Sequence, residues 1–215
     1  MCVMKQRIFN LIILDESGSM FGIKQETINS VNETIQTIRK AQQDHPEQEN
    51  YVSAVTFNNE AKTVYNCVEA DKVKEFGPDN YNPNCSTALY DAMGFSLTAL
   101  RRKVAPDDKV LVTVVTDGYE NSSREYSGSA IKSLVDELKG KGWVFAYIGA
   151  NHDVTAVAST ISITNVMSFA SSGYGTQIMT DKVNRSRERL YSKIALKDFD
   201  AQEANCSFFD ENDDK

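Results

Sequence analysis

Residues 9–20 read FNLIILDESGSM, an apolar run that passes directly into a polar turn. The first six residues are mostly bulky and apolar, which predicts a buried β-strand. Gly18 lets the backbone turn sharply, and the turn carries an oxygen-bearing side chain at every second position: Asp15, Ser17 and Ser19. The pattern indicates a ligand-binding turn at the carboxyl end of this strand.

A second apolar strand ends in a similar way. Residues 110–116, VLVTVVT, are almost all β-branched and predict a central strand, and Asp117 follows at once. Ligands of open α/β sheets bind beyond the carboxyl ends of the strands. If these two strands are neighbours, their backbones lie about 4.8 Å apart, and the partly buried carboxylates of Asp15 and Asp117 would repel each other. A cation between them would remove that repulsion.

The chemistry of the donors indicates which cation this would be. Carboxylate and hydroxyl oxygens favour a hard divalent ion such as Mg²⁺, with Mn²⁺ or Ca²⁺ as alternatives. Zn²⁺ would instead require histidine or cysteine ligands. Two carboxylates balance the charge of a divalent ion, and neutral hydroxyls leave it able to accept a further ligand.

Strand-like and helical segments alternate along the chain, which is typical of an α/β domain with a mostly parallel sheet. Its 215 residues, 41% of them hydrophobic, suit one globular domain, which we expect to span residues 1–195. The predicted strands cover residues 9–14, 51–57, 62–68, 110–116, 144–148 and 166–169. The predicted helices lie around residues 28–38, 87–100, 131–138, 154–161 and 176–195.

Charge and composition exclude several classes of partner. The formal net charge is −7, and residues 197–215 hold seven acidic residues and two lysines, so the body is nearly neutral. It lacks the basic surface that binds nucleic acid or anionic membranes, and no stretch approaches the roughly 20 apolar residues that cross a bilayer. Residues 1–14 lack a signal-peptide cleavage site, and the four cysteines form no CxxC pair. We therefore expect a cytoplasmic protein with reduced thiols, and an acidic, flexible tail over residues 196–215.

Three motifs carry a resemblance to a known family. DESGSM at 15–20, CSTALYDA at 85–92 and VVTDG at 114–118 resemble the von Willebrand factor A domain, and the order of elements agrees from residue 9 to about 195. The resemblance implies a three-layer α/β/α Rossmann-like fold. Its central six-stranded sheet would have the strand order 3-2-1-4-5-6 and one antiparallel edge strand.

The resemblance also implies a metal-ion-dependent adhesion site. Three residues would be direct or switchable ligands, namely Ser17, Ser19 and Thr87, while Asp15 and Asp117 would hold coordinated waters. The sixth position would be filled by an Asp or Glu of a partner protein. The family often has glycine two residues before the threonine, where this chain has Cys85. The expected function is thus a non-enzymatic, Mg²⁺-dependent protein-binding module with no catalytic residues, and the oligomeric state stays open.

Other interpretations of the same residues remain. Asp and Ser after a strand also cap helices, and the domain could be a scaffold that works without metal. A Mg²⁺-dependent phosphatase with Asp15 as nucleophile would need a second carboxylate close by, where this chain has Ser17. A Ser-His-Asp triad finds no support, because His45 and His152 are expected to be structural or solvated. Two acids that flank the proposed site, Glu16 and Glu120, are expected to be solvated or to tune partner choice.

Overall fold

A six-stranded sheet forms the centre of the computed structural model, which describes residues 5–150 and 153–209. The strand order is β3-β2-β1-β4-β5-β6. β3 runs antiparallel to β2 at one edge, and all other pairs are parallel. The expected strand order and fold class are confirmed. The strands are β1 (Gln6–Asp15), β2 (Gln48–Phe57), β3 (Ala61–Glu69), β4 (Lys109–Thr116), β5 (Trp143–Gly149) and β6 (Asn165–Ser168).

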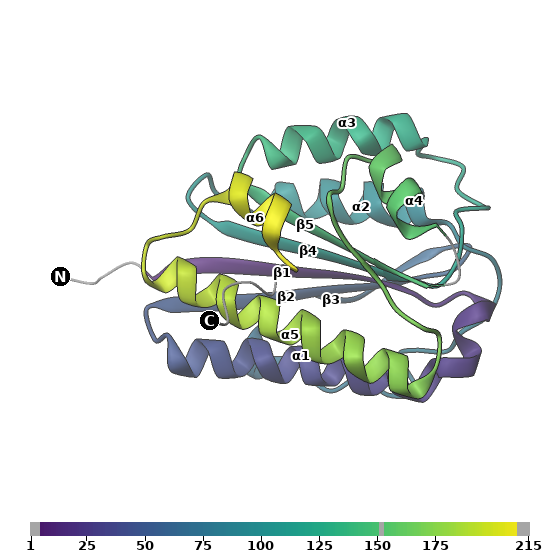
Figure 1. The fold of residues 1–215 in the computed structure, drawn as a ribbon, viewed down its shortest axis with the longest axis horizontal. Helices are drawn as coiled ribbons and strands as arrows, with labels where there is room; N and C mark the ends of the chain where they lie inside the picture. The colour runs from purple at the N-terminus through teal and green to yellow at the C-terminus, as the bar shows by residue number, and fades with distance from the viewer. Residues whose placement is uncertain (1–4, 151–152, 210–215) are drawn as a thin grey trace.

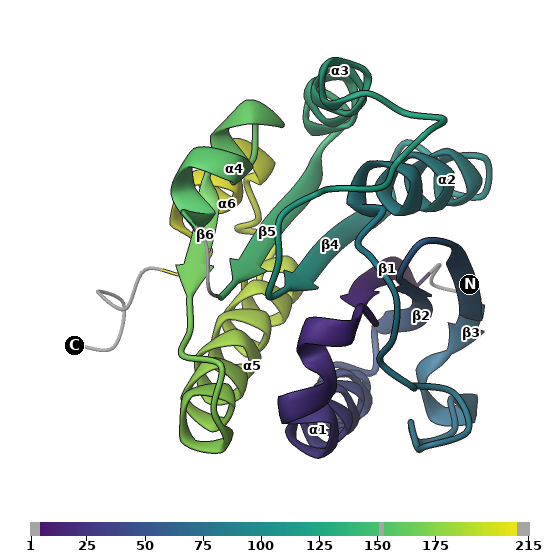
Figure 2. The same ribbon diagram turned by 90° about the vertical axis from the view of Figure 1, so that its right-hand side faces the viewer.

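Helices cover both faces of this sheet (Figure 1, Figure 2). Two long helices lie side by side on one face: α1 (Lys24–Asp44) and α5 (Gly173–Ala195). The other face is covered by α2 (Leu89–Arg101), α3 (Gly128–Lys139) and α4 (Val154–Thr160). Two short 3₁₀ helices, η1 (Gly18–Ile23) and η2 (Ala70–Lys72), follow β1 and β3. No helix within the described residues is long and apolar enough to span a membrane.

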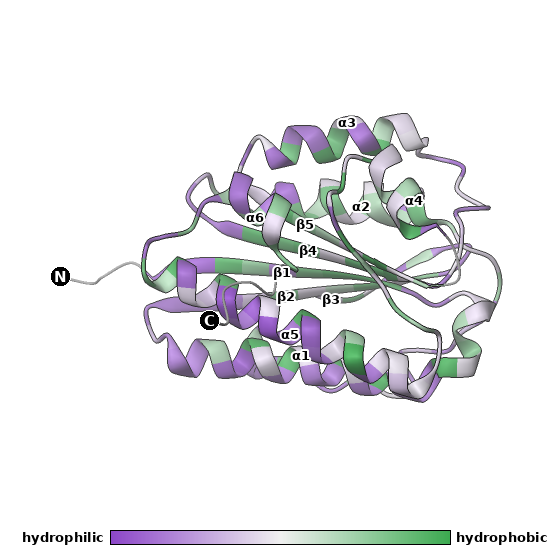
Figure 3. Cartoon of the chain, viewed as in Figure 1, coloured by the Kyte–Doolittle hydropathy of each residue, from purple (hydrophilic) through white to green (hydrophobic). Residues whose placement is uncertain are grey.

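The sheet separates two hydrophobic cores, and β1 contributes to both. Phe9, Leu11 and Ile13 pack under α2 and α3, whereas Ile12 and Leu14 pack under α1 and α5. This is why the first strand is apolar at successive positions, unlike a strand with one solvated face. In Figure 3, hydrophobic residues run along the central strands, and hydrophilic residues are frequent on the helices. Each large side chain buried in this way stabilises the fold by about 1.5–3 kcal/mol.

The chain after α5 differs from the expected tail. A further helix, α6 (Ala201–Ser207), lies against β5 and β6, and the Asp200 carboxylate caps it by accepting bonds from two backbone amides. Asn205 is buried and bonds to the backbone of β5, and Phe208 is also buried. The acidic composition of this stretch predicted a flexible tail, because it gave no indication that Asn205 and Phe208 are buried. The expectation for residues 210–215 lies outside the described residues.

Candidate metal centre

The carboxyl ends of β1 and β4 place two carboxylates at one edge of the sheet. The strands are adjacent and in register from Ile8 with Lys109 to Leu14 with Val115. Asp15 directly follows Leu14, and Asp117 lies two residues after Val115. The exposed fractions of the two aspartates are 0% and 3%. The adjacency that the family resemblance implied for the two strands is therefore confirmed.

Asp15 is held by hydrogen bonds to both carboxylate oxygens. The Ser17 backbone amide donates to Oδ1 at 2.7 Å, and the Thr116 hydroxyl donates to Oδ2 at 2.5 Å. Burial nevertheless raises the pKa of Asp15 to about 6, and the negative charge of Asp117 adds to this rise, while the hydrogen bonds partly oppose it. Ionised Asp15 is therefore destabilising in the absence of a nearby positive charge.

The two serines link the first loop to Asp117. The hydroxyl oxygens of Ser17 and Ser19 lie 3.1 Å apart, and the Ser19 hydroxyl donates to Oδ1 of Asp117 in a short hydrogen bond. Three side-chain oxygens from two separate loops thus lie within one hydrogen-bonded cluster.

Thr87 reaches the same cluster from a third loop. A Cβ atom placed on Gly118 would lie 3.6 Å from the Thr87 hydroxyl and 3.8 Å from the Ser19 hydroxyl, so both oxygens face the same point of the backbone. The Thr87 backbone is fixed by Asn121, whose side chain accepts from its amide at 2.9 Å and whose own amide donates to its carbonyl at 3.0 Å. The structure thus brings together all five residues singled out in the sequence.

Cys85 occupies the position where the family often has glycine. The backbone conformation of Cys85 explains the family's preference for glycine there. Its φ is +62°, in the left-handed region that glycine adopts most easily. Its carbonyl accepts a hydrogen bond from the Gly18 amide at 3.0 Å, which ties this loop to the turn after β1. The thiol is free, and the loop keeps the glycine-like conformation while the Thr87 hydroxyl still lies close to Gly118.

The two flanking acids have structural roles in place of the expected solvated ones. Glu16 is 8% exposed, and its carboxylate accepts a short bond from the Asn82 amide. Glu120 accepts from the amides of Ser122 and Ser123, and from the Tyr90 amide in the first turn of α2. Both acids therefore fix the loops around the site.

Two exposed aromatic residues lie near the site in sequence, and the histidine that the structure describes lies far from it. Phe21 and Tyr119, each two residues beyond a site residue, are 69% and 55% exposed. His45 follows α1 at the opposite edge of the sheet, and His152 lies outside the described residues. Within residues 5–150 and 153–209, no three Asp, Glu, His or Cys side chains form a metal-binding group. The candidate site has two carboxylates, and hydroxyls make up the rest.

Sequence reasoning missed three residues that support this site: Thr116, Asn121 and Glu120 in its bracing role. Thr116 was predicted only as the end of a strand, and its hydroxyl holds Asp15. Asn121 and Glu120 lie in an irregular loop, where no periodicity indicates which way a side chain points. The nearest available signal was the polar run ENSS at residues 120–123, which begins three residues after Asp117.

Comparison with known proteins agrees with this architecture. The family model of the von Willebrand factor type A domain matches residues 11–182. Comparison with curated protein sequences finds no match.

Solved structures share the fold at low sequence identity. The PilB minor pilin from Streptococcus sanguinis is 14% identical with a TM-score of 0.61, over 86% of this chain and 62% of the pilin. The von Willebrand factor type A protein from Catenulispora acidiphila is 15% identical with a TM-score of 0.57, over 83% and 42%. The SpRpn10 VWA domain is 10% identical with a TM-score of 0.56, over 80% and 93%. This chain therefore spans less than two thirds of the first two proteins, and these likenesses establish the fold alone.

Proposed function

Because this chain belongs to the von Willebrand factor type A domain family, we propose that it is a protein-binding module that works through a bound divalent cation. Mg²⁺ is the first candidate, with Mn²⁺ or Ca²⁺ as alternatives. Domains of this family are generally protein-interaction modules. The ion would be held by five residues: Asp15, Ser17, Ser19, Thr87 and Asp117.

The proposal is carried by one observation, the convergence of two buried carboxylates and three hydroxyls at a single edge of the sheet. This oxygen-only set fits a hard divalent ion. Burial disfavours ionised Asp15, and a neighbouring positive charge would remove that cost. Two carboxylates also balance the charge of the ion, so that the site as a whole need not be strongly charged.

The partner would supply an Asp or Glu carboxylate to the cation. The bound ion would supply a Lewis-acidic position for that carboxylate. The hydroxyls of Ser17, Ser19 and Thr87 would be the direct ligands of the ion, as in the family pattern. Phe21 and Tyr119 are exposed aromatic residues beside the site, and exposed aromatic side chains are frequent anchors of interfaces. The proposed partner therefore carries an acidic residue flanked by apolar ones, and the proposed setting is the cytoplasm.

One structural feature favours a second candidate, a scaffold that works without metal. The Ser19 hydroxyl already bonds to Asp117, so this part of the cluster is satisfied by the protein itself. A non-enzymatic role is part of both proposals. Asp15 is fully buried, and both its oxygens accept hydrogen bonds, which is a poor arrangement for a phosphatase nucleophile.

Calorimetric titration of the EDTA-treated protein with Mg²⁺ and Mn²⁺ tests the cation. We expect one binding event per chain that is lost in Thr87→Ala and kept in Thr63→Ala, a matched change at an exposed position on β3. Absence of any uptake at millimolar ion would contradict the metal-dependent proposal and leave the scaffold.

Affinity capture tests the partner. Partners retained from a native lysate in Mg²⁺ should be lost both in EDTA and with the Asp15→Ala variant. Partners that remain bound under both conditions would support the scaffold instead.

A further inference from the structure

A fully buried arginine lies beneath α5, on the same face of the sheet as α1. Arg187 is 0% exposed and projects from the helix toward β1 and β4. A guanidinium stays charged under all conditions in which proteins fold. The core therefore contains a permanent positive charge that needs compensation.

Among the residues that the structure describes, the hydrogen-bond partners of this charge are neutral. Nη1 donates to the Asn10 side-chain oxygen at 3.2 Å, and Nη2 donates to the Thr113 hydroxyl at 2.6 Å. The Asn10 oxygen is shared, because it also accepts from the Tyr191 hydroxyl at 2.7 Å. Nε is buried without a hydrogen-bond partner, and no carboxylate in the described part of the chain pairs with the guanidinium. Burying a charge in this way costs several kcal/mol unless an opposite charge lies nearby.

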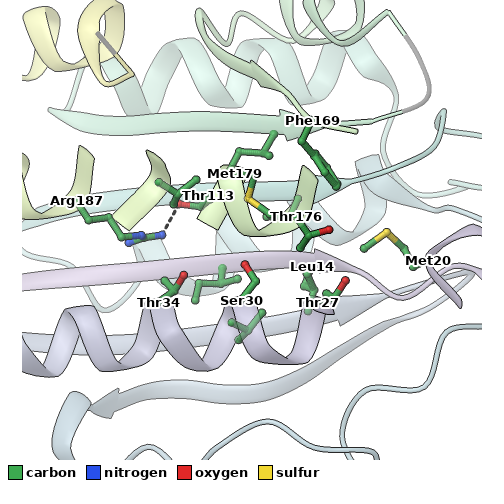
Figure 4. A pocket seen from close by; sticks show the side chains of 15 residues that line it. Leu14, Met20, Thr27, Ser30, Thr34, Thr113, Phe169, Thr176, Met179 and Arg187 are labelled. Atoms are coloured by element: carbon green, nitrogen blue, oxygen red, sulfur yellow. Dashed lines mark hydrogen bonds between the residues drawn. The ribbon is translucent and has the colours of Figure 1, made fainter. Parts of the chain in front are cut away.

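A small cavity adjoins the guanidinium. It lies between α1, α5 and the sheet, has a volume of about 30 Å³, and is lined by Arg187 at one end (Figure 4). Ser30, Thr34 and Thr113 line the part near the arginine, while the remaining wall is mostly apolar and also includes Thr27 and Thr176. A water molecule needs roughly 10–15 Å³ measured in this way, so the cavity has room for about two waters or one small ion.

We propose that this cavity binds a small monovalent anion, with chloride as the probe, as the counter-charge of Arg187. The small volume favours a compact anion, the positive charge disfavours cations, and a neutral water would leave the charge uncompensated. The orphaned Nε–H and the neighbouring hydroxyls are hydrogen-bond donors of the kind that hold a halide. The anion would lie at the Arg187 end of the cavity, whereas Met20, the neighbour of Ser19, lines the opposite end. The inference does not depend on the proposed function.

The direct experiment is a crystal structure of the full chain grown in sodium bromide. We expect an anomalous peak in the cavity, within hydrogen-bond distance of Nε of Arg187. A cavity that contains only water, or an organic carboxylate, would overturn the halide assignment. This experiment requires no variant, so it decides the question even if changes at Arg187 prevent folding.

The solution experiment compares thermal unfolding in sodium chloride and in sodium gluconate of equal ionic strength. All samples contain EDTA, so that binding at the metal centre cannot contribute. Once chloride exceeds its dissociation constant, the midpoint should rise by about 3–5 °C for each tenfold increase in chloride. Arg187→Met should lose this dependence, whereas Arg185→Met, an exposed change on the same helix, should keep it. An equal response to gluconate, or an unchanged chloride response in Arg187→Met, would contradict the proposal.

Discussion

The hydroxyl of Ser19 donates a hydrogen bond to the carboxylate of Asp117, across a sequence separation of 98 residues. This contact depends on β1 and β4 being neighbours in the sheet, because each loop leaves the same edge. It also shows how a site made of short side chains is assembled. The strands set the distance between the loops, and hydrogen bonds within the loops set the direction of each oxygen.

The raised pKa of Asp15 predicts that the metal-free protein is less stable at neutral pH than at acidic pH because of this residue. The folded state binds the proton more tightly than the unfolded chain, whose Asp pKa is about 4. The contribution of Asp15 is therefore fully present below pH 4 and is lost as the pH rises through about 6. Asp15→Asn should raise the free energy of unfolding by about 1–3 kcal/mol at pH 7 in EDTA.

Urea unfolding at pH 4 and at pH 7 measures this effect. The two proteins should differ little at pH 4, where Asp15 is protonated in the folded state and about half protonated in the unfolded chain. Adding Mg²⁺ at pH 7 should then stabilise the wild type and leave Asp15→Asn unchanged. Equal stability of the two proteins at pH 7 in EDTA would show that burial does not destabilise the ionised carboxylate.

The contacts of Asn121 predict that replacing this residue weakens metal binding and leaves the fold intact. Its side chain and backbone amide hold both backbone groups of Thr87, so Asn121→Ala should let the threonine hydroxyl move away from the site. Changes to such supporting residues typically weaken metal binding by about 10–100-fold. Calorimetry gives the affinity and circular dichroism the fold, with Asn66→Ala on the exposed edge of β3 as the matched control. Unaltered affinity in Asn121→Ala would mean that Thr87 is positioned by other contacts.

The left-handed backbone of Cys85 predicts that glycine is better tolerated than alanine at this position. A non-glycine residue in that conformation costs about 1–2 kcal/mol, and the greater freedom of glycine in the unfolded chain offsets part of the gain. Cys85→Gly should therefore raise the free energy of unfolding by about 0.5–1 kcal/mol, whereas Cys85→Ala should give no increase. Denaturant unfolding in a reducing buffer distinguishes the two. A similar gain in both variants would point to loss of the thiol as the cause.

Helix α6 predicts that the acidic end of the chain contributes to stability. Asn205 accepts from the Phe145 amide at 3.0 Å and donates to the Trp143 carbonyl at 2.8 Å, and it is 4% exposed. Asn205→Ala would leave these backbone groups of β5 without their partner, at a cost of about 2–3 kcal/mol. Gln202→Ala, an exposed change on the same helix, should cost less than 0.5 kcal/mol. If the two variants have the same urea midpoint, α6 does not dock stably in solution.

The sequence was most informative where periodicity and chain order carry the information. The apolar run before Asp15 and the β-branched run before Asp117 predicted two buried strands, and the family pattern placed them side by side. The same reasoning could not identify Glu120 or Asn121 as supports, because an irregular loop has no repeating geometry. Acidic composition similarly suggested a flexible tail, although Asn205 and Phe208 are buried in the structure.

Arg187 shows a signal that was present and not used. Residue type alone predicts that an arginine on a helix of a globular domain faces solvent. Arg187 follows Val183 by four residues and precedes Leu190 by three, which places it on the buried stripe of the helix. Helical spacing, and not residue type, therefore decided the burial of this arginine.

The wide separation of the donors along the chain has a further consequence. Oxygens from the turn after β1, from Thr87 and from the end of β4 meet only when half of the polypeptide has reached its native arrangement. A short synthetic peptide that contains DESGSM would lack the other two contributions. Ion uptake, once measured, would then serve as a gauge of the correctly assembled fraction in any preparation of this protein.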